Sequence, residues 1–183
     1  MTKKTQRWVL AGEVLLIAAL LYFFRGHLGA LINPKNADLE GKPAPEIGPG
    51  AWINADTLRM AELRGRVVLL DFWSYRCGPC LSTLPALEAW RKEFPALVII
   101  GVHSPQGVQE RDPENVRRAA ARHGISWPVV TDNGMITWTA YRAQLWPTFY
   151  LVDRRGVVRA IHRGSIGLGG LRDDIERLLR EPA

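Results

Sequence analysis

Two cysteines lie close together directly after an apolar run, and they constrain the chain more than any other feature. The residues from Val67 to Trp73 predict a buried strand, and Cys77-Gly78-Pro79-Cys80 follows where a helix should begin. A thiol at a helix N-terminus ionises readily because unpaired N–H groups and the helix dipole stabilise its anion. The chain has only these two cysteines, which disfavours a closed zinc site, and a bridge between them closes too small a loop to be mainly structural. The pattern predicts thiol–disulfide chemistry.

The N-terminal segment combines basic residues with an apolar stretch. From Trp8 to Phe24 the chain is apolar except for Gly12 and Glu13, which is near the minimum length for crossing a bilayer. A cleaved signal peptide is the alternative, but Leu28-Gly29-Ala30 places a large residue where cleavage needs a small one. We predict an uncleaved transmembrane signal-anchor over residues 8–25, after a cytoplasmic basic tail over residues 1–7.

Charge and composition divide the rest of the chain. The basic bias ahead of the span favours a cytoplasmic N-terminus, so we expect a single-pass protein of the inner (cytoplasmic) membrane whose folded domain is periplasmic. Residues 26–42 are rich in Pro, Gly, Asn and Lys and predict a linker, which leaves one domain over residues 43–183. The formal net charge of the chain is +6. Its arginines are dispersed along the sequence and form no basic cluster, so nucleic-acid binding is not expected.

Apolar periodicity and turn residues predict an alternation of strands and helices. The apolar run Leu97–Val102 predicts a buried parallel strand. The resulting architecture is an α/β sandwich with a mixed central sheet and helices on both faces. The other expected elements are a hairpin within Trp52–Leu63, helices from Cys77 to Phe94 (with Pro85 inside), Pro113 to His123 (capped by Asp112), Met135 to Tyr141 and Leu168 to Arg180, a strand within Trp127–Thr131, and a hairpin of Thr148–Val152 with Val157–His162.

Several separated motifs resemble one family. Asp71-Phe72-Trp73, Cys77-Gly78-Pro79-Cys80 and Trp146-Pro147-Thr148 resemble the thioredoxin superfamily. The helix and strand inserted before Pro147 resemble the membrane-anchored TlpA/ResA branch. The motifs Gly101-Val102-His103-Ser104-Pro105 and Trp138-Thr139-Ala140-Tyr141-Arg142 are most similar to the thioredoxin-like domain of DipZ-type proteins. The similarity covers about Pro43 to Leu179 and implies a thioredoxin-like fold with a TlpA-type insertion.

The two cysteines take different parts in the expected reaction. Cys77, the more exposed at the helix start, attacks a partner disulfide, and Cys80 resolves the mixed disulfide. Gly78 and Pro79 keep the turn tight, and by resemblance this pair is typical of reducing members. Arg76 either lowers the pKa of Cys77 or is an exposed arginine that meets partners.

Resemblance also assigns residues around the cysteine pair. Asp71 would accept the Cys80 proton if burial raises its pKa, the alternative being an ion pair at the strand end. Pro147 should be cis and leave the backbone of Trp146 free to pair with an extended substrate; a trans proline that starts an edge strand is the alternative. Tyr75 would flank the site or pack at its rim. His103 is expected to be a hydrogen-bonded structural histidine rather than a catalytic one.

These observations predict a membrane-anchored, extracytoplasmic thiol–disulfide oxidoreductase that needs no cofactor and no metal. By resemblance it would be a disulfide reductase whose clients are exported proteins with disulfides or dithiols, including apocytochrome c. It would receive electrons from a CcdA-type membrane partner. One alternative is a thiol oxidase of the DsbA type. Another is a copper-handling assembly factor that uses Cys77, Cys80 and His103.

Overall fold

The computed structural model describes residues 39–182 of the chain. The predicted basic tail, the signal-anchor over residues 8–25 and most of the linker over residues 26–42 lie outside the described residues. Among residues 39–182, no helix has both the length and the apolar character needed to span a bilayer.

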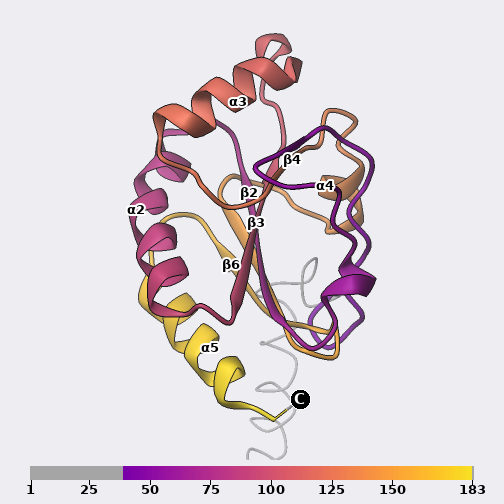
Figure 1. Cartoon of the computed structure of the whole chain (residues 1–183), viewed down its shortest axis with the longest axis vertical. Coiled ribbons are helices and arrows are strands. Elements are labelled where there is room, and N and C mark those ends of the chain that lie inside the picture. The colour runs from indigo at the N-terminus through magenta and orange to yellow at the C-terminus, as the bar shows by residue number, and fades with distance from the viewer. Residues whose placement is uncertain (1–38, 183) are drawn as a thin grey trace, which may run out of the picture. The chain divides into compact units, whose positions relative to one another are not determined.

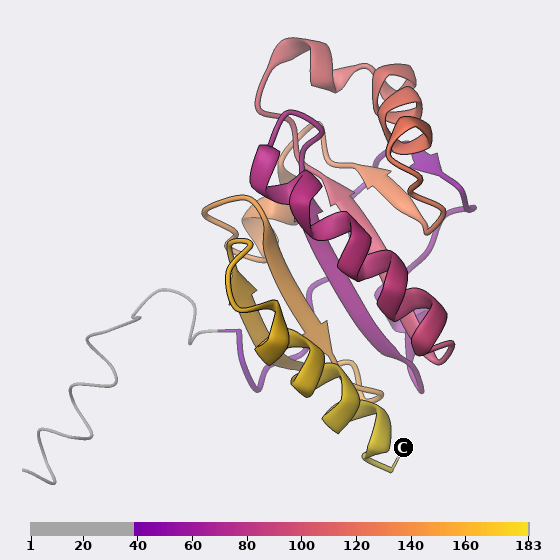
Figure 2. The ribbon, with the colours of Figure 1, turned by 90° about the vertical axis from the view of Figure 1, so that its left-hand side faces the viewer.

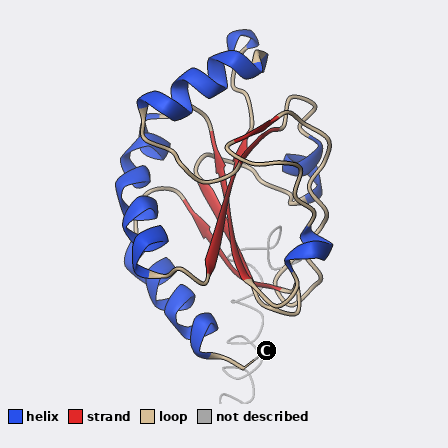
Figure 3. Ribbon diagram, in the orientation of Figure 1, coloured by secondary structure: helices blue, strands red, loops and turns tan. Residues whose placement is uncertain are grey.

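Within residues 39–182, six strands form one mixed sheet in the order β1-β4-β3-β2-β5-β6 (Figures 1 and 3). Strands β2, β3 and β4 run parallel, whereas β1, β5 and β6 pair antiparallel with their neighbours. Strand β2 lies between β3 and β5, so the chain leaves it at the centre of the sheet. The predicted mixed sheet is confirmed. Its strands are β1 (Trp52–Ile53), β2 (Val67–Trp73), β3 (Leu97–His103), β4 (Val129–Thr131), β5 (Thr148–Val152) and β6 (Val158–Arg163).

The three long helices all cover the same face of the sheet. Helices α2 and α5 lie side by side along it (Figure 2), and Val116 and Ala120 of α3 belong to the same core cluster. Among the described residues, the opposite face carries only short elements, such as η1 and α4 (Figure 1). Helices thus lie on both faces of the sheet, as predicted, but the long ones share one face and the short ones lie on the other. The helical elements are η1 (Met60–Leu63), α2 (Gly78–Glu93), η2 (Val108–Arg111), α3 (Pro113–Arg122), α4 (Ile136–Ala140) and α5 (Leu168–Arg180).

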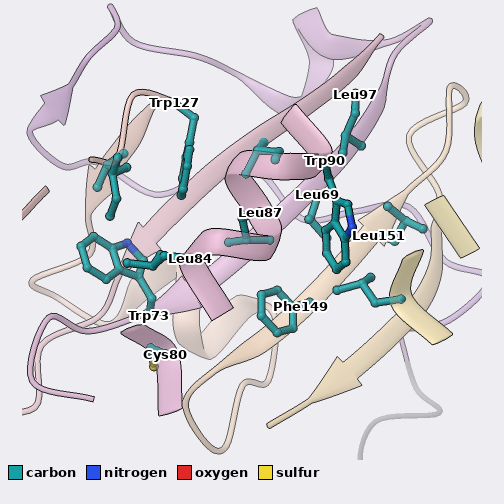
Figure 4. Close-up of a cluster of buried hydrophobic side chains, with 14 of the residues drawn as sticks. Leu69, Trp73, Cys80, Leu84, Leu87, Trp90, Leu97, Trp127, Phe149 and Leu151 are labelled. Carbon is teal, nitrogen blue, oxygen red and sulfur yellow. The ribbon is translucent and has the colours of Figure 1, made fainter. Parts of the chain in front are cut away.

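Alternation along β2 decides which side chains meet the long helices. Leu69 and Trp73 pack into the cluster beneath α2, together with Leu84, Leu87 and Cys80 (Figure 4). Val68, Leu70 and Phe72 of β2 belong to a second cluster on the other face. Because side chains of a strand alternate between faces, Asp71 shares the α2 face with Leu69 and Trp73. An acidic group is therefore buried on the side of the sheet that carries the cysteines.

Gly101 of β3 leaves room for the indole ring of Trp73. A Cβ at this position would lie 2.9 Å from Trp73 Nε1 and 3.1 Å from Val129 Cγ2. We expect Gly101→Ala to lower the free energy of unfolding by about 1–3 kcal/mol, because the core cannot absorb the methyl group without shifts. Urea denaturation measures this, with Gly169→Ala in α5 as the control because its methyl group meets no neighbour. Equal stability of Gly101→Ala and the unchanged chain would contradict the tight contact.

The chain before β1 is attached to the beginning of β6. The Gly41 N–H donates to Val158 O (2.8 Å), and the Val158 N–H donates to Lys42 O (2.9 Å). Pro43 forms an antiparallel bridge with Val157, and Leu39 is buried in the second core cluster. Residues 39–42, which the sequence places in the linker, therefore pack against the folded domain.

The predicted hairpin within Trp52–Leu63 is wrong. Strand β1 pairs antiparallel with β4 instead, with Trp52 opposite Val130. The following residue, Asn54, has a φ of 65°, and its side-chain amide donates to Ile125 O (2.9 Å) and to Trp127 O (3.2 Å). These bonds hold the segment beside β4, so it does not fold back on itself.

Candidate active site

Cys77 and Cys80 lie at the start of α2, immediately after the central strand β2, and form a disulfide. Cys77 is the N-cap residue of this helix, and its Sγ accepts a hydrogen bond from the Cys80 N–H (3.2 Å). Cys77 is 6% exposed and Cys80 is fully buried. An N–H group aimed at the sulfur stabilises a thiolate there. Cys77 is the sulfur that a partner can reach, in agreement with its expected part as attacking thiol.

Gly78 and Pro79 form the exposed first turn of α2 between the two sulfurs. A Cβ on Gly78 would meet no atom within 4 Å. Pro79 lacks an N–H at a helix position where that group would have no intrahelical partner. Gly78 and Pro79 therefore leave open space beside Cys77, which a partner molecule needs in order to approach the sulfur.

Asp71 is enclosed by the core on the α2 face. Its side chain is 1% exposed, and Oδ1 has no hydrogen-bond partner within the described residues. Burial raises its pKa to about 8, and no cation contributes to this shift. The ion-pair alternative is therefore not supported. A carboxyl group with a pKa near that of a thiol can exchange a proton with one at neutral pH.

The Trp146–Pro147 peptide bond is cis, as predicted, and the trans alternative is wrong. Pro147 is buried directly before β5. Because β5 is antiparallel to β2 and Thr148 pairs with Phe72, Pro147 lies at the end of the sheet where β2 leads to the cysteines. The half-buried ring of Trp146 packs against Trp138, with centroids 4.2 Å apart. The pairing of the Trp146 backbone with a substrate stays a prediction.

His103, at the end of β3, is held by aromatic rings. Its ring stacks on Tyr75 with centroids 5.4 Å apart and meets the edge of Trp73 at 5.2 Å. Burial lowers its pKa to about 4, so the ring is neutral at pH 7. Neither ring nitrogen makes a hydrogen bond within the described residues. The expectation of a structural histidine is supported by this packing, but the expected hydrogen bond is not found.

The copper-binding alternative requires three ligands in one place. Within residues 39–182, no three His, Cys, Asp or Glu side chains are grouped so that they could hold a metal ion. The imidazole of His103 is enclosed by Tyr75 and Trp73 and does not join the cysteines as a ligand set. The geometry therefore gives the copper alternative no support.

Arg76 extends toward η2. Its side chain is about half exposed, Nη1 donates to Gln109 Oε1 (3.1 Å), and Nε lies 3.9 Å from Glu110 Oε1. The guanidinium thus has partners in the inserted segment. An effect of Arg76 on the pKa of Cys77 and contact of Arg76 with partners both stay predictions.

Ser74 and Glu110 are site residues that sequence reasoning missed. Both are fully buried, and the Ser74 hydroxyl donates to Glu110 Oε2 (2.6 Å). Glu110 stands between Gln109 and Arg111, and such a polar run is typical of an exposed turn. The one signal in the sequence is the position of Ser74, directly between the strand and the cysteine motif.

Comparisons with known proteins agree on one family. The model of the AhpC/TSA family matches residues 41–161. Protein DipZ of Mycobacterium bovis is 37% identical over 156 residues, which cover 76% of this chain and 22% of DipZ. The thiol-disulfide oxidoreductase YkuV of Bacillus subtilis is 28% identical, over 76% of this chain and 96% of YkuV. The crystal structure of a thioredoxin-like superfamily protein matches with a TM-score of 0.72 and 28% identity, over 77% of this chain and 98% of that one. The chain thus spans about a fifth of the length of DipZ.

Proposed function

Since the chain belongs to the AhpC/TSA family and is a thiol–disulfide oxidoreductase of thioredoxin-like fold, we propose that it is a disulfide reductase for exported proteins. The observation that carries this proposal is the placement of the redox pair. Cys77 caps α2 and receives the Cys80 N–H, while Asp71 is buried on the same face of the sheet with a pKa of about 8. The Gly-Pro pair between the cysteines, which resembles the reducing members, favours this direction of electron flow.

The proposed cycle uses two thiols and one carboxyl group. The Cys77 thiolate attacks one sulfur of a client disulfide, which breaks the client S–S bond and releases one client thiolate. Asp71 accepts the proton of the Cys80 thiol, and the resulting thiolate attacks Cys77 Sγ. The second client thiolate leaves, and Cys77 and Cys80 form a disulfide. The client gains two electrons, and an external dithiol must reduce the protein again.

Location, clients and electron donor follow from the sequence-based expectations. The proposed protein is anchored in the inner membrane by residues 8–25 and carries its thioredoxin-like domain on the periplasmic side. That compartment is where disulfides form and need correction. Its clients would be exported proteins with paired cysteines, such as apocytochrome c. A CcdA-type membrane protein would supply the electrons.

The direction of electron flow can be tested by the reduction potential of the Cys77–Cys80 couple. We expect the full-length chain in detergent, equilibrated against dithiothreitol or glutathione buffers, to give a value near that of thioredoxin, about −270 mV. The fraction of oxidised protein is measured by thiol alkylation and mass shift. A value near about −120 mV would overturn the reductase proposal and favour a thiol oxidase of the DsbA type.

A further inference from the structure

A carboxyl group is completely buried beneath the loop that leads into Cys77. Glu110 of η2 is inaccessible to solvent, and Oε2 accepts a hydrogen bond from the Ser74 hydroxyl (2.6 Å). The same oxygen lies 3.4 Å from His103 Nε2, and Oε1 lies 3.9 Å from Arg76 Nε. Burial of a carboxyl group is costly unless other groups compensate for its lost hydration. Here the hydrogen bond comes from Ser74, while Oε1 of Glu110 has no hydrogen-bond partner among residues 39–182.

The Ser74 hydroxyl transmits this contact to the backbone around Cys77. A hydroxyl group has one proton to donate. Since Ser74 donates it to Glu110, the oxygen lone pairs face the loop, where the Arg76 N–H donates to Ser74 Oγ (3.1 Å). The Cys77 N–H donates to the carbonyl oxygen of the same serine (3.1 Å). Ser74 therefore closes the turn that ends at the attacking sulfur, and Glu110 sets the orientation of its hydroxyl.

The segment that carries Glu110 is itself fixed. The Asn115 side-chain amide donates to Gln109 O (2.8 Å), and that of Asn133 donates to Arg111 O (2.7 Å). These two bonds hold the backbone on either side of Glu110. Tyr75, in the middle of the turn, stacks on His103. The turn is thus supported by the inserted segment from one side and by the end of β3 from the other.

We propose that Glu110 is a positioning residue for Cys77. Through Ser74 it holds the turn that keeps Cys77 Sγ at the first turn of α2, where the Cys80 N–H reaches it. A looser turn would weaken this hydrogen bond, so a smaller fraction of Cys77 would be thiolate at neutral pH and attack would be slower. The inference concerns the same cysteines as the proposed function. It requires only that Cys77 takes part in thiol–disulfide exchange, whether the protein reduces or oxidises its clients.

The test compares Glu110→Ala, Glu110→Gln and Ser74→Ala in full-length protein that also carries Cys80→Ser, so that Cys77 is the only thiol. The pH midpoint of alkylation by iodoacetamide and the rate of attack on oxidised glutathione are measured. We expect Glu110→Ala and Ser74→Ala to raise the midpoint by about one pH unit and to slow attack at pH 7 about tenfold, since one unit of pKa changes the thiolate fraction by that factor. Glu110→Gln should recover much of the loss, because its amide oxygen can accept the Ser74 proton.

Glu114→Ala is the matched control, since Glu114 is an exposed carboxylate nearby in sequence that pairs with Arg117. A double variant of Ser74 and Glu110 should lose no more than the worse single variant, because both act through one path. Additive losses, or an unchanged midpoint and rate in folded Glu110→Ala, would overturn the proposal. If Glu110→Ala does not fold, Ser74→Ala decides: an unchanged midpoint overturns the proposal. Failure of the reductase proposal would appear in the absolute reduction potential instead.

Discussion

Replacing Cys80 with serine is expected to stop the reaction at its midpoint and leave Cys77 joined to the client through a mixed disulfide. The chain has no third cysteine, so no other thiol of the protein can take the place of Cys80 in releasing the reduced client. Turnover in a disulfide-reduction assay should fall at least about a thousandfold, because loss of one member of a catalytic pair removes nearly the whole rate enhancement. The same serine leaves the Cys77 N-cap and the backbone N–H at position 80 intact, so attack should still occur.

The adduct can be measured by mass spectrometry after reaction with a disulfide-containing client. Cys77→Ser is the matched control and should lose turnover without accumulating an adduct, since Cys80 is fully buried. If Cys77→Ser formed the mixed disulfide and Cys80→Ser did not, the assignment of attacking and resolving thiols would be reversed.

Asp71→Asn is expected to make the protein more stable and less active. The pKa of Asp71 is raised from 3.8 to about 8, so between these values the folded chain binds a proton that the unfolded chain has released. The sign follows: the part of the burial cost that is linked to ionisation of Asp71 is absent at pH 3, and it rises with pH until about pH 8. At pH 7 the asparagine variant should gain about 2–4 kcal/mol in free energy of unfolding, less than the full linkage term because its amide is also buried.

Urea denaturation at pH 4, 7 and 9 measures the difference between the two proteins, and the separate titration of His103 cancels in that difference. The difference should grow from pH 4 to pH 8 and then level off. Resolution of the mixed disulfide should slow about a hundredfold, within the usual range for loss of a general base. A constant stability difference across this pH range, or resolution at the original rate, would contradict the assigned protonation.

Elements with strong local signals could be predicted well. Asp112 caps α3 through the Glu114 N–H (2.9 Å), and Pro113 stands at its first turn. Helix α5 has the predicted bounds, with Leu171, Ile175 and Leu178 buried on one face. In each case the residues that determine the element lie within the element or next to it. The position of the two cysteines and their expected order of use rest on signals of the same local kind.

Features that depend on distant partners could not be predicted. Trp52 pairs with Val130, and nothing in the residues around Trp52 distinguishes that pairing from a hairpin. Glu110 is buried because the insertion after β3 returns to Ser74, 36 residues earlier in the chain. Its neighbours in sequence are polar and indicate exposure. Such contacts depend on how the segment after β3 packs against the rest of the fold. The spacing of apolar residues along the sequence carries no information about that packing.

The attachment of the segment before β1 to β6 has a practical consequence for recombinant fragments. A strand at the edge of a sheet presents free N–H and C=O groups to which another chain can add, and proline and lysine discourage such addition. Lys42 and Pro43 lie against the beginning of β6 and cover its edge there. A fragment that lacks the residues up to Ala44 would leave this strand edge uncovered, and a second molecule could pair with it. A soluble form of the domain should therefore keep Leu39 and the residues after it.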